Sequence, residues 1–186
     1  MDLSLSDIVN AVKRHIADRV GIDVVFAPPS RLVAQKSNDK DVVVALSIVS
    51  QQERGLIRMP YGYVDDTKRE VKIRDYIIYE LSFQIDIVGK GREAVKRVEE
   101  LYKKLMCSIP PSKVHGFITG RLFGVIEVMS HVFPLFLEAV EDLTDLEPQD
   151  ELRIARKTMT ITCQCAIAYT QVVKSVLTPQ LDLGLQ

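Results

Sequence analysis

The sequence predicts an α+β fold: a mixed, mostly antiparallel sheet with a long hairpin, covered on one face by two helices. Two segments with helical apolar spacing and two long segments of alternating apolar and polar residues predict this class. Such alternation is typical of antiparallel strands that place one face in a core. The 186 residues accommodate a single domain over residues 1–172, followed by a C-terminal arm or flexible tail over residues 173–186.

The first segment is predicted to be a helix because its apolar residues recur at helical spacing. This apolar stripe consists of Ile8, Val9, Val12, Ile16 and Val20. Ser4 and Asp7 have the spacing of a capping box, and Gly21 suits the position after a helix C-terminus. Residues 22–26 are expected to form a short strand before Pro28.

A long hairpin is expected next. Residues 42–49 form a β-branched run of strand length, and residues 76–88 alternate regularly. The hairpin arms are predicted over residues 42–52 and 69–88, with a long mobile loop over residues 50–70. One face of the second arm carries Ile77, Tyr79, Leu81, Phe83, Ile85 and Ile87. The other face, expected to lie in water, carries Glu80, Ser82, Gln84 and Asp86.

The second helix is predicted to begin after a turn at Gly89 and Gly91 and to end before Pro110. Its apolar stripe consists of Ala94, Val95, Val98, Leu101, Tyr102, Leu105 and Met106. Residues 117–133 are expected to be mostly strand, which Pro134 ends.

The last part of the chain begins with seven acidic residues and no basic ones over residues 138–151, which predicts an acidic loop. A final strand is predicted over about residues 153–170. One of its faces carries Met159, Ile161, Cys163, Cys165, Ile167 and Tyr169. The tail, TPQLDLGLQ, is interpreted as having no period.

Composition excludes several classes of protein. The formal net charge of -1 provides no general attraction to nucleic acid or to an anionic membrane. No apolar run is long enough for a transmembrane helix, and the first residues lack the basic and apolar regions of a signal peptide. Three cysteines do not make a disulfide framework, so we expect a reducing compartment.

Two motifs offer chemistry, and each has a simpler interpretation. Cys163 and Cys165 share a strand face and could meet a metal, but no complete zinc ligand set accompanies them, and buried cysteine is a common core residue. The Gly89–Arg92 turn could bind phosphate at a helix N-terminus, but it lacks the full dinucleotide and P-loop patterns. Glycine is also needed there for backbone reasons alone. No catalytic motif is found.

The charge layout offers a candidate interface. Segment 54–74 carries six basic and three acidic residues, whereas segment 138–151 is purely acidic. Both segments could be unrelated solvated loops. Alternatively, a basic patch on one copy meets an acidic patch on another, which is a heterologous contact that closes into a ring. The candidate interface residues are Arg54, Arg58, Arg69, Lys72 and Arg74 on the basic side, and Glu141, Asp142, Asp145 and Glu147 on the acidic side.

The order of these elements resembles that of phage tail terminator proteins, also called tail completion or neck proteins. Residues 79–105, YELSFQIDIVGKGREAVKRVEELYKKL, show an alternating strand, a polar glycine turn and a charged helix, as those proteins do. Residues 142–169, DLTDLEPQDELRIARKTMTITCQCAIAY, show an acidic loop leading into a Thr-rich alternating strand. The likeness covers most of residues 1–170 and is one of pattern rather than of catalytic residues.

The resemblance implies a homohexameric ring that caps the tail tube and stops its polymerisation. The ring would bind the tail tube protein, the head–tail connector or neck proteins and, in a contractile tail, the sheath protein. The resemblance implies no reaction, cofactor or metal, no membrane partner, and contact with DNA only where it passes through the lumen. It places the protein in the virion after assembly in the host cytoplasm. The alternatives are another head–tail joining or baseplate protein and a small phosphate- or nucleotide-binding enzyme that uses Gly89–Arg92.

Overall fold

The predicted α+β class is confirmed. The computed structural model describes residues 3–27, 42–58, 63–65, 70–107, 121–144 and 154–174. The helices are α1 (Leu5–Val20) and α3 (Arg92–Cys107). The strands are β1 (Val24–Phe26), β2 (Val42–Arg58), β3 (Tyr63–Asp65), β4 (Glu70–Lys90), β5 (Arg121–Val128), β6 (His131–Asp142) and β7 (Ile154–Lys174).

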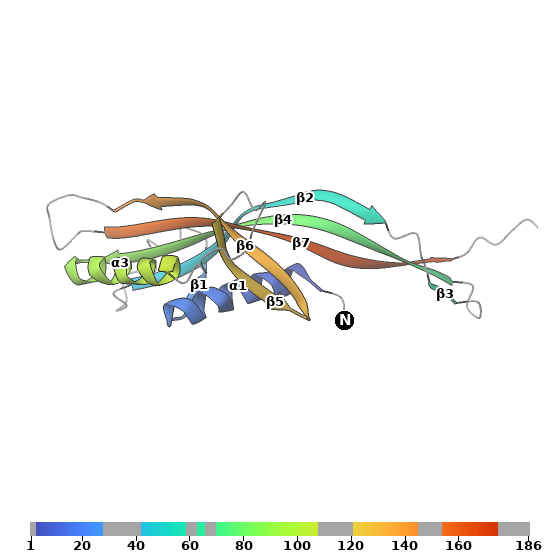
Figure 1. Cartoon of the computed structure of the whole chain (residues 1–186), viewed down its shortest axis with the longest axis horizontal. Helices are drawn as coiled ribbons and strands as arrows, with labels where there is room; N and C mark the ends of the chain where they lie inside the picture. Colours follow the sequence, from blue (N-terminus) through green and yellow to red (C-terminus); the bar gives the residue numbers. More distant parts are fainter. Residues whose placement is uncertain are drawn as a thin grey trace, which may run out of the picture.

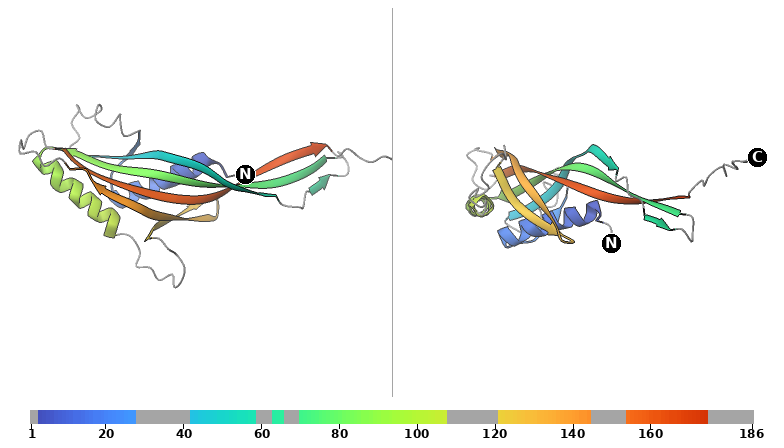
Figure 2. Two further views of the ribbon diagram at one scale, coloured as in Figure 1. Left: turned by 90° about the horizontal axis from the view of Figure 1, so that it is seen from above. Right: turned by 45° about the vertical axis from the view of Figure 1, so that its right-hand side comes forward.

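The strands form one curved sheet in the order β1-β2-β4-β7-β6-β5, and β3 pairs with β4 (Figure 1). β1 runs parallel to β2, and the other neighbouring pairs are antiparallel. β2 and β4 form the predicted long hairpin, in which Val42 lies opposite Gly89 and Arg58 lies opposite Asp75. Both helices lie on the same face of this sheet (Figure 2).

The main core lies between the helices and the sheet face that they cover. In α1 the buried residues are Ile8, Val12, Ile16 and Val20, and in α3 they are Ala94, Val98, Leu101 and Leu105. In β4 they are Leu81, Phe83, Ile85 and Ile87. The apolar residues of the two predicted helices and of the predicted alternating strand therefore pack in one hydrophobic cluster, as their periodicity predicts.

The ends of α1 are fixed by the predicted caps. The backbone N–H of Asp7 donates to the Ser4 hydroxyl at 3.3 Å, and the Asp7 carboxylate accepts from the Ser4 backbone N–H at 3.0 Å. Gly21 closes the helix in the left-handed region, at φ 72°, and donates to the Ala17 carbonyl at 2.8 Å. A side chain at this position would be strained, so glycine is the favoured residue.

α1 also contacts β5 closely. Arg19 donates from Nη1 to the Phe123 carbonyl at 2.7 Å, and its guanidinium lies over the Phe123 ring at 4.8 Å. The register of β5 shifts between Leu122 and Gly124, which marks a bulge. A Cβ atom at Gly124 would lie only 2.4 Å from the His15 Nε2 atom, so only glycine allows this close approach.

Three sets of expectations about the strands need correction. The predicted loop over residues 50–70 is largely strand, because β2 continues to Arg58 and β3 covers Tyr63–Asp65. Two register shifts in β2, at Ile48/Ser50 and at Glu53/Gly55, carry the strand through this polar stretch. β7 likewise continues to Lys174, past its predicted end at residue 170.

Pro134 does not end a strand, which is the second correction. It lies within β6 and pairs with Val125 of β5. The pairing of β6 with β7 begins only at Leu135, so Pro134 has a strand on one side and needs no N–H for the other. The acidic loop expected over residues 138–151 is also wrong in its first part, because β6 continues through Asp142.

The third correction concerns Asp86, which does not face water. Its side chain is 1% exposed and lies on the sheet face opposite the helices. Its Oδ1 atom accepts from Arg156 Nη2 at 2.9 Å and from Thr158 Oγ1 at 2.7 Å. Its Oδ2 atom accepts from Gln84 at 2.8 Å. A second small cluster, formed by Ala27, Ala45 and Val88, is buried on this face. A carboxylate in such a place requires partners of this kind.

Candidate assembly surface

The three longest strands continue past the rest of the fold as a three-stranded ribbon. β6 pairs with β7 only as far as Cys163, and the helices lie beside the other end of the sheet (Figures 1 and 2). We define the arm as residues 52–58, 63–65, 70–80 and 164–174, and the body as the other described residues. The arm consists of a sheet whose end projects beyond the helical layer, so a neighbouring molecule can reach it.

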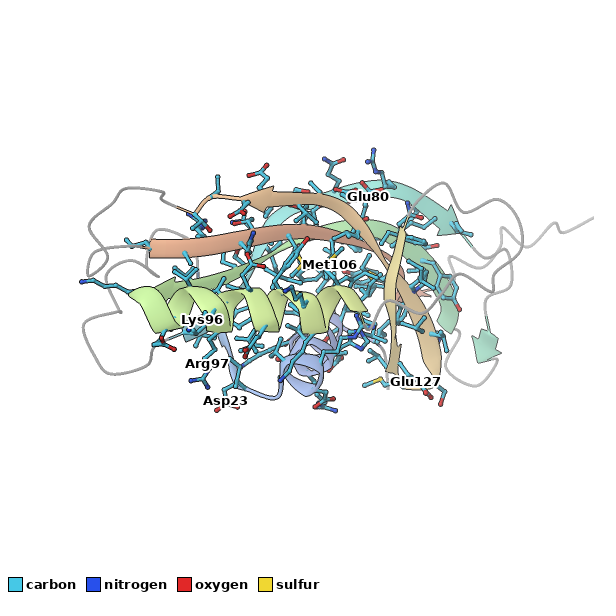
Figure 3. All side chains as sticks on the ribbon, turned by 60° about the vertical axis from the view of Figure 1, so that its left-hand side comes forward. Asp23, Glu80, Lys96, Arg97, Met106 and Glu127 are labelled. Carbon is cyan, nitrogen blue, oxygen red and sulfur yellow. The ribbon has the colours of Figure 1, made fainter. Side chains whose placement is uncertain are left out.

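A cross-strand polar network stiffens the arm where it leaves the body. Arg54 donates to Glu80 at 2.6 Å, and Gln164 donates to the other Glu80 oxygen at 3.1 Å. The three residues come from β2, β4 and β7, and Glu80 projects from the face opposite α3 (Figure 3). The hydrogen bond from Arg54, followed by that from Gln164, lowers the pKa of Glu80, so this carboxylate is ionised at neutral pH.

Beyond this network the arm exposes large apolar side chains on both faces. Leu56 is 51% exposed and Ile57 is 50% exposed, and consecutive strand residues point to opposite faces. Tyr169 of β7 is 43% exposed. A hydrogen bond with the Tyr169 side chain, helped by partial burial, raises the pKa of Tyr79 to about 12. The Tyr79 phenol therefore stays neutral at pH 7, and this part of the arm surface carries no charge from it.

The β2 edge of the arm is protected against pairing with other strands. Among the described residues, β1 covers β2 only at Val44–Leu46. The rest of the edge carries the two bulges, and charged residues occupy positions 53, 54 and 58. Bulges and charges are devices by which natural sheets prevent edge-to-edge association.

The β7 edge of the arm has no such protection. Past Cys163, the described strands lie only on the β4 side of β7. The register with β4 is continuous from Ile154 to Lys174, and residues 164–173 contain neither a charged residue nor a proline. A long, regular, uncharged edge is a template for pairing with another strand. It is therefore the described strand edge that is most open to pairing with another strand.

The acidic candidates lie at the opposite end of the sheet, near the end of β6. Asp142 forms an ion pair with Lys157 and accepts from the Thr144 hydroxyl at 2.6 Å. These contacts, led by that from Lys157, lower the pKa of the Asp142 carboxyl. Lys157 also pairs with Glu99 of α3 at 2.9 Å, which ties the strand to the helix. Glu141 is exposed on β6.

Apart from Glu141, which is exposed on β6, the other eight predicted interface residues fall into three groups. Arg54 and Asp142 are exposed by 52% and 54%, but each makes an ion pair within the chain. The backbone places Arg58, Lys72 and Arg74 in the arm, on β2 and β4, and their side chains lie outside the described part. Arg69, Asp145 and Glu147 lie outside the described residues. The described members of the basic and acidic groups thus lie toward opposite ends of the sheet, and their complementarity between copies remains a prediction.

The cysteine pair belongs to the core. Cys163 and Cys165 are free thiols, buried on the helix-covered side of β7. Burial raises the pKa of Cys163 to about 12 and that of Cys165 to about 11. Thiols with such pKa values are poor nucleophiles and poor metal ligands at neutral pH. Within the described ranges, no group of three or more His, Cys, Asp or Glu side chains could hold a metal ion.

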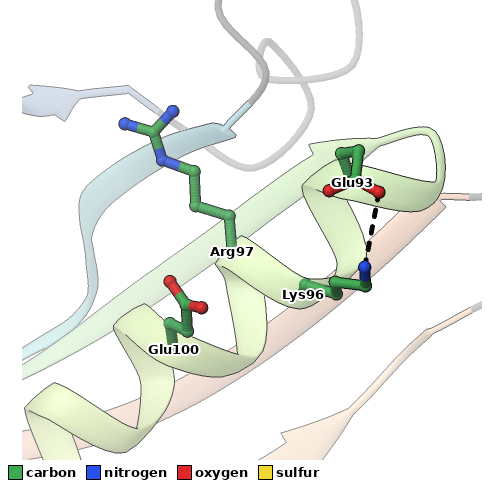
Figure 4. A pocket seen from close by; sticks show the side chains of 4 residues that line it. All are labelled: Glu93, Lys96, Arg97 and Glu100. Atoms are coloured by element: carbon green, nitrogen blue, oxygen red, sulfur yellow. Dashed lines mark hydrogen bonds and ion pairs between the residues drawn. The ribbon is translucent and has the colours of Figure 1, made fainter.

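The glycine turn leads from β4 into α3, as predicted, with Gly91 at φ 90°. A hollow of about 310 Å³ lies on the first turns of α3, lined by Glu93, Lys96, Arg97 and Glu100 (Figure 4). Lys96 pairs with Glu93 at 3.4 Å, and both side chains are largely exposed. The two carboxylates oppose an anion as much as the two bases attract it, so the hollow does not favour phosphate.

Known protein families offer no match. No family model and no curated protein matches this chain. In the described ranges, neither helix has the length and apolar character needed to cross a lipid bilayer.

The arm edge is a candidate site that the sequence analysis does not predict. The expected loop over residues 50–70 includes Leu56 and Ile57, because this stretch is polar, contains glycine and has no clear period. The signal that points to the arm is the ten-residue stretch 164–173, which has no charge although the chain is 26% charged. Such a strand has no charged residue to block edge-to-edge pairing.

Proposed function

We propose that this chain is a structural protein of a phage tail that assembles into a closed ring, most simply a hexamer, and ends the polymerisation of the tail tube. The resemblance in element order supports the tail terminator assignment. The uncharged β7 edge of the arm is the observation that carries the assembly role, because such an edge is a template for pairing with another chain. No covalent chemistry is part of this proposal.

A ring rather than a two-fold dimer requires that the β7 edge of one copy meets a surface other than the β7 edge of the next copy. The β2 edge is bulged and charged, whereas the β7 edge is regular and uncharged. A surface that binds a different surface on an identical copy makes a heterologous contact, and such contacts close into rings. The basic residues of the arm and the acidic end of β6 would add a second heterologous contact.

The proposed partners follow from the ring. One face of the ring would dock on the last ring of tail tube protein, and the other would present the surface for the head–tail connector or, in a contractile tail, for the sheath. The exposed Leu56 and Ile57 lie on opposite faces of the arm and can serve both contacts. DNA would pass through the lumen without specific contacts. The protein would therefore reside in the virion after assembly in the host cytoplasm.

Deletion of the gene from the phage genome tests the tail terminator role. We expect particles with tail tubes longer than the native length in electron micrographs, and expect the native length to return when the chain is supplied from a plasmid. Free tails of normal length would instead indicate a head–tail joining protein. Tails without a tip structure would indicate a baseplate protein.

Native mass spectrometry tests ring formation directly. The native chain, alone or with tube protein, should give a single closed oligomer. Reversing the charge of Arg69 and Arg74 should reduce its yield if charge complementarity holds the ring. An unchanged yield would remove the charge contact and leave the β7 edge as the basis of assembly. A chain that stays monomeric even on the tube would contradict the proposed function.

A further inference from the structure

The sequence of the C-terminal tail contains a short pattern that is typical of a strand. Leu181, Leu183 and Leu185 alternate with Asp182 and Gly184, contrary to the expectation that the tail has no period. This alternation is that of a strand with one apolar face. β7 ends at Lys174, so twelve residues, 175–186, follow the arm in the chain.

The residues between β7 and this pattern disfavour a return onto the same strand. The segment Ser175–Gln180 contains Ser175 and Pro179 but no Gly, Asn or Asp, the residues that two-residue hairpin turns prefer. Thr178 precedes Pro179, and a residue before proline favours an extended conformation. An extended chain of twelve residues spans up to about 40 Å, so the leucines can reach another molecule.

We propose that residues 181–186 of one copy add as a strand to the open β7 edge in the arm of a neighbouring copy. This inference rests on the proposed ring assembly and names the segment that holds the copies together. The acceptor is the uncharged stretch 164–173, whose outer N–H and C=O groups face no described strand. Backbone hydrogen bonds supply the affinity in such strand addition, and alternate side chains supply the register.

The apolar sides of donor and acceptor match. Cys165, Ile167 and Tyr169 are on the sheet face that the helices cover in the body, because they lie opposite Tyr79, Ile77 and Asp75 of β4. Ile167 is 4% exposed, whereas Tyr169 at the end of the row is 43% exposed. Three leucines on the same side would extend this apolar row by one strand and cover the Tyr169 ring.

Hydrogen exchange of the full chain tests the inference. In the native assembly, the β7 amides that face the open edge should exchange slowly. Changing Leu181, Leu183 and Leu185 together to Asp should speed their exchange by about tenfold or more. The matched control changes Gln180, Gly184 and Gln186 to Asp, which adds the same charge at the alternate positions and should keep most of the protection. Equal protection in the native and leucine variants would overturn the inference.

Mixed assemblies decide between the tail of a neighbour and the tail of the same chain. Isotopically labelled chains carrying the three Leu→Asp changes are assembled with an excess of unlabelled native chains. Native tails should then protect the β7 edges of the labelled chains. If the labelled chains stay unprotected, the tail acts within its own chain and the proposal is wrong.

The oligomeric state separates this inference from the proposed function. A native ring that keeps its mass while residues 164–173 exchange fast would overturn the tail contact alone. A native chain that shows neither a ring nor protection, with or without tube protein, would overturn both. Loss of the ring only in the leucine variant would support both.

Discussion

The body and the arm use the same three strands in opposite ways. Each region carries an Arg–carboxylate pair on the sheet face opposite the helices: Arg156 with Asp86 in the body, and Arg54 with Glu80 in the arm. The body carboxylate is 1% exposed, whereas the arm carboxylate is 21% exposed. The same kind of cross-strand ion pair is therefore part of a buried layer in the body and lies on the surface in the arm.

The apolar residues show the same difference. Phe83 of β4 is fully buried under the helices, but Leu56 in the arm is half-exposed. Phe83 lies in a regularly alternating stretch, whereas the residues around Leu56, QQERGLIR, do not alternate. Burial also follows the covering layer, which the helices provide over Phe83 and which no described residue provides over the exposed side of Leu56.

The largest expected effect comes from breaking the buried pair of the body. Asp86→Ala leaves the Arg156 guanidinium, which is only 27% exposed, without its charge partner. We expect a loss of about 3 kcal/mol in the free energy of unfolding, as for other buried pairs that lose one member. Urea denaturation followed by circular dichroism measures it. The double variant with Arg156→Ala should recover part of the loss, and additive losses would argue against coupling.

The sequence predicts the body better than the arm, because the body has the helical layer that gives its strands a buried face. The capping box at Ser4, the helical stripes and the strand at 76–88 follow from local chemistry and one buried face. The burial of Asp86 does not follow from local chemistry, because its partner Arg156 is 70 residues away in the chain. Nor does the arm, because the residues of β2 before Leu56 are polar and have no clear period, which is typical of a loop.

The next largest effect on stability is expected from alanine substitution at one glycine of the body, compared with one glycine of the arm. A Cβ atom at Gly124 in the body would lie 2.4 Å from His15 Nε2 and 2.9 Å from Arg19 Nη2, whereas one at Gly55 in the arm would meet nothing within 4 Å. Gly124→Ala should lower the free energy of unfolding by about 1–3 kcal/mol through overpacking. Gly55→Ala should be neutral or slightly stabilising. Equal losses in thermal denaturation would show that the arm is packed as tightly as the body.

A smaller effect on stability is expected at acid pH, where His15 titrates. Burial, followed by the charge of Arg19, lowers the pKa of His15 from 6.5 to about 4, and Asp18 opposes this only weakly. The unfolded chain therefore binds a proton below about pH 6.5 that the folded chain binds only near pH 4. Stability should fall as the pH is lowered through this window. His15→Gln should flatten that part of the urea midpoint profile, and an unchanged slope would show that His15 is not the titrating group.

The smallest expected effect comes from the exposed pair of the arm. Glu80→Gln keeps a hydrogen-bond acceptor for Arg54 and Gln164 and removes only a charge that solvent already screens. The urea midpoint of the Glu80→Gln variant should equal that of the native chain within measurement error. Added salt should not change this agreement, because solvent and salt screen an exposed pair far more than a buried one. The same substitution is the sharpest test of the comparison. If it destabilises the protein as much as Asp86→Ala does, the arm is part of the packed body, and its uncharged β7 edge no longer argues for a partner.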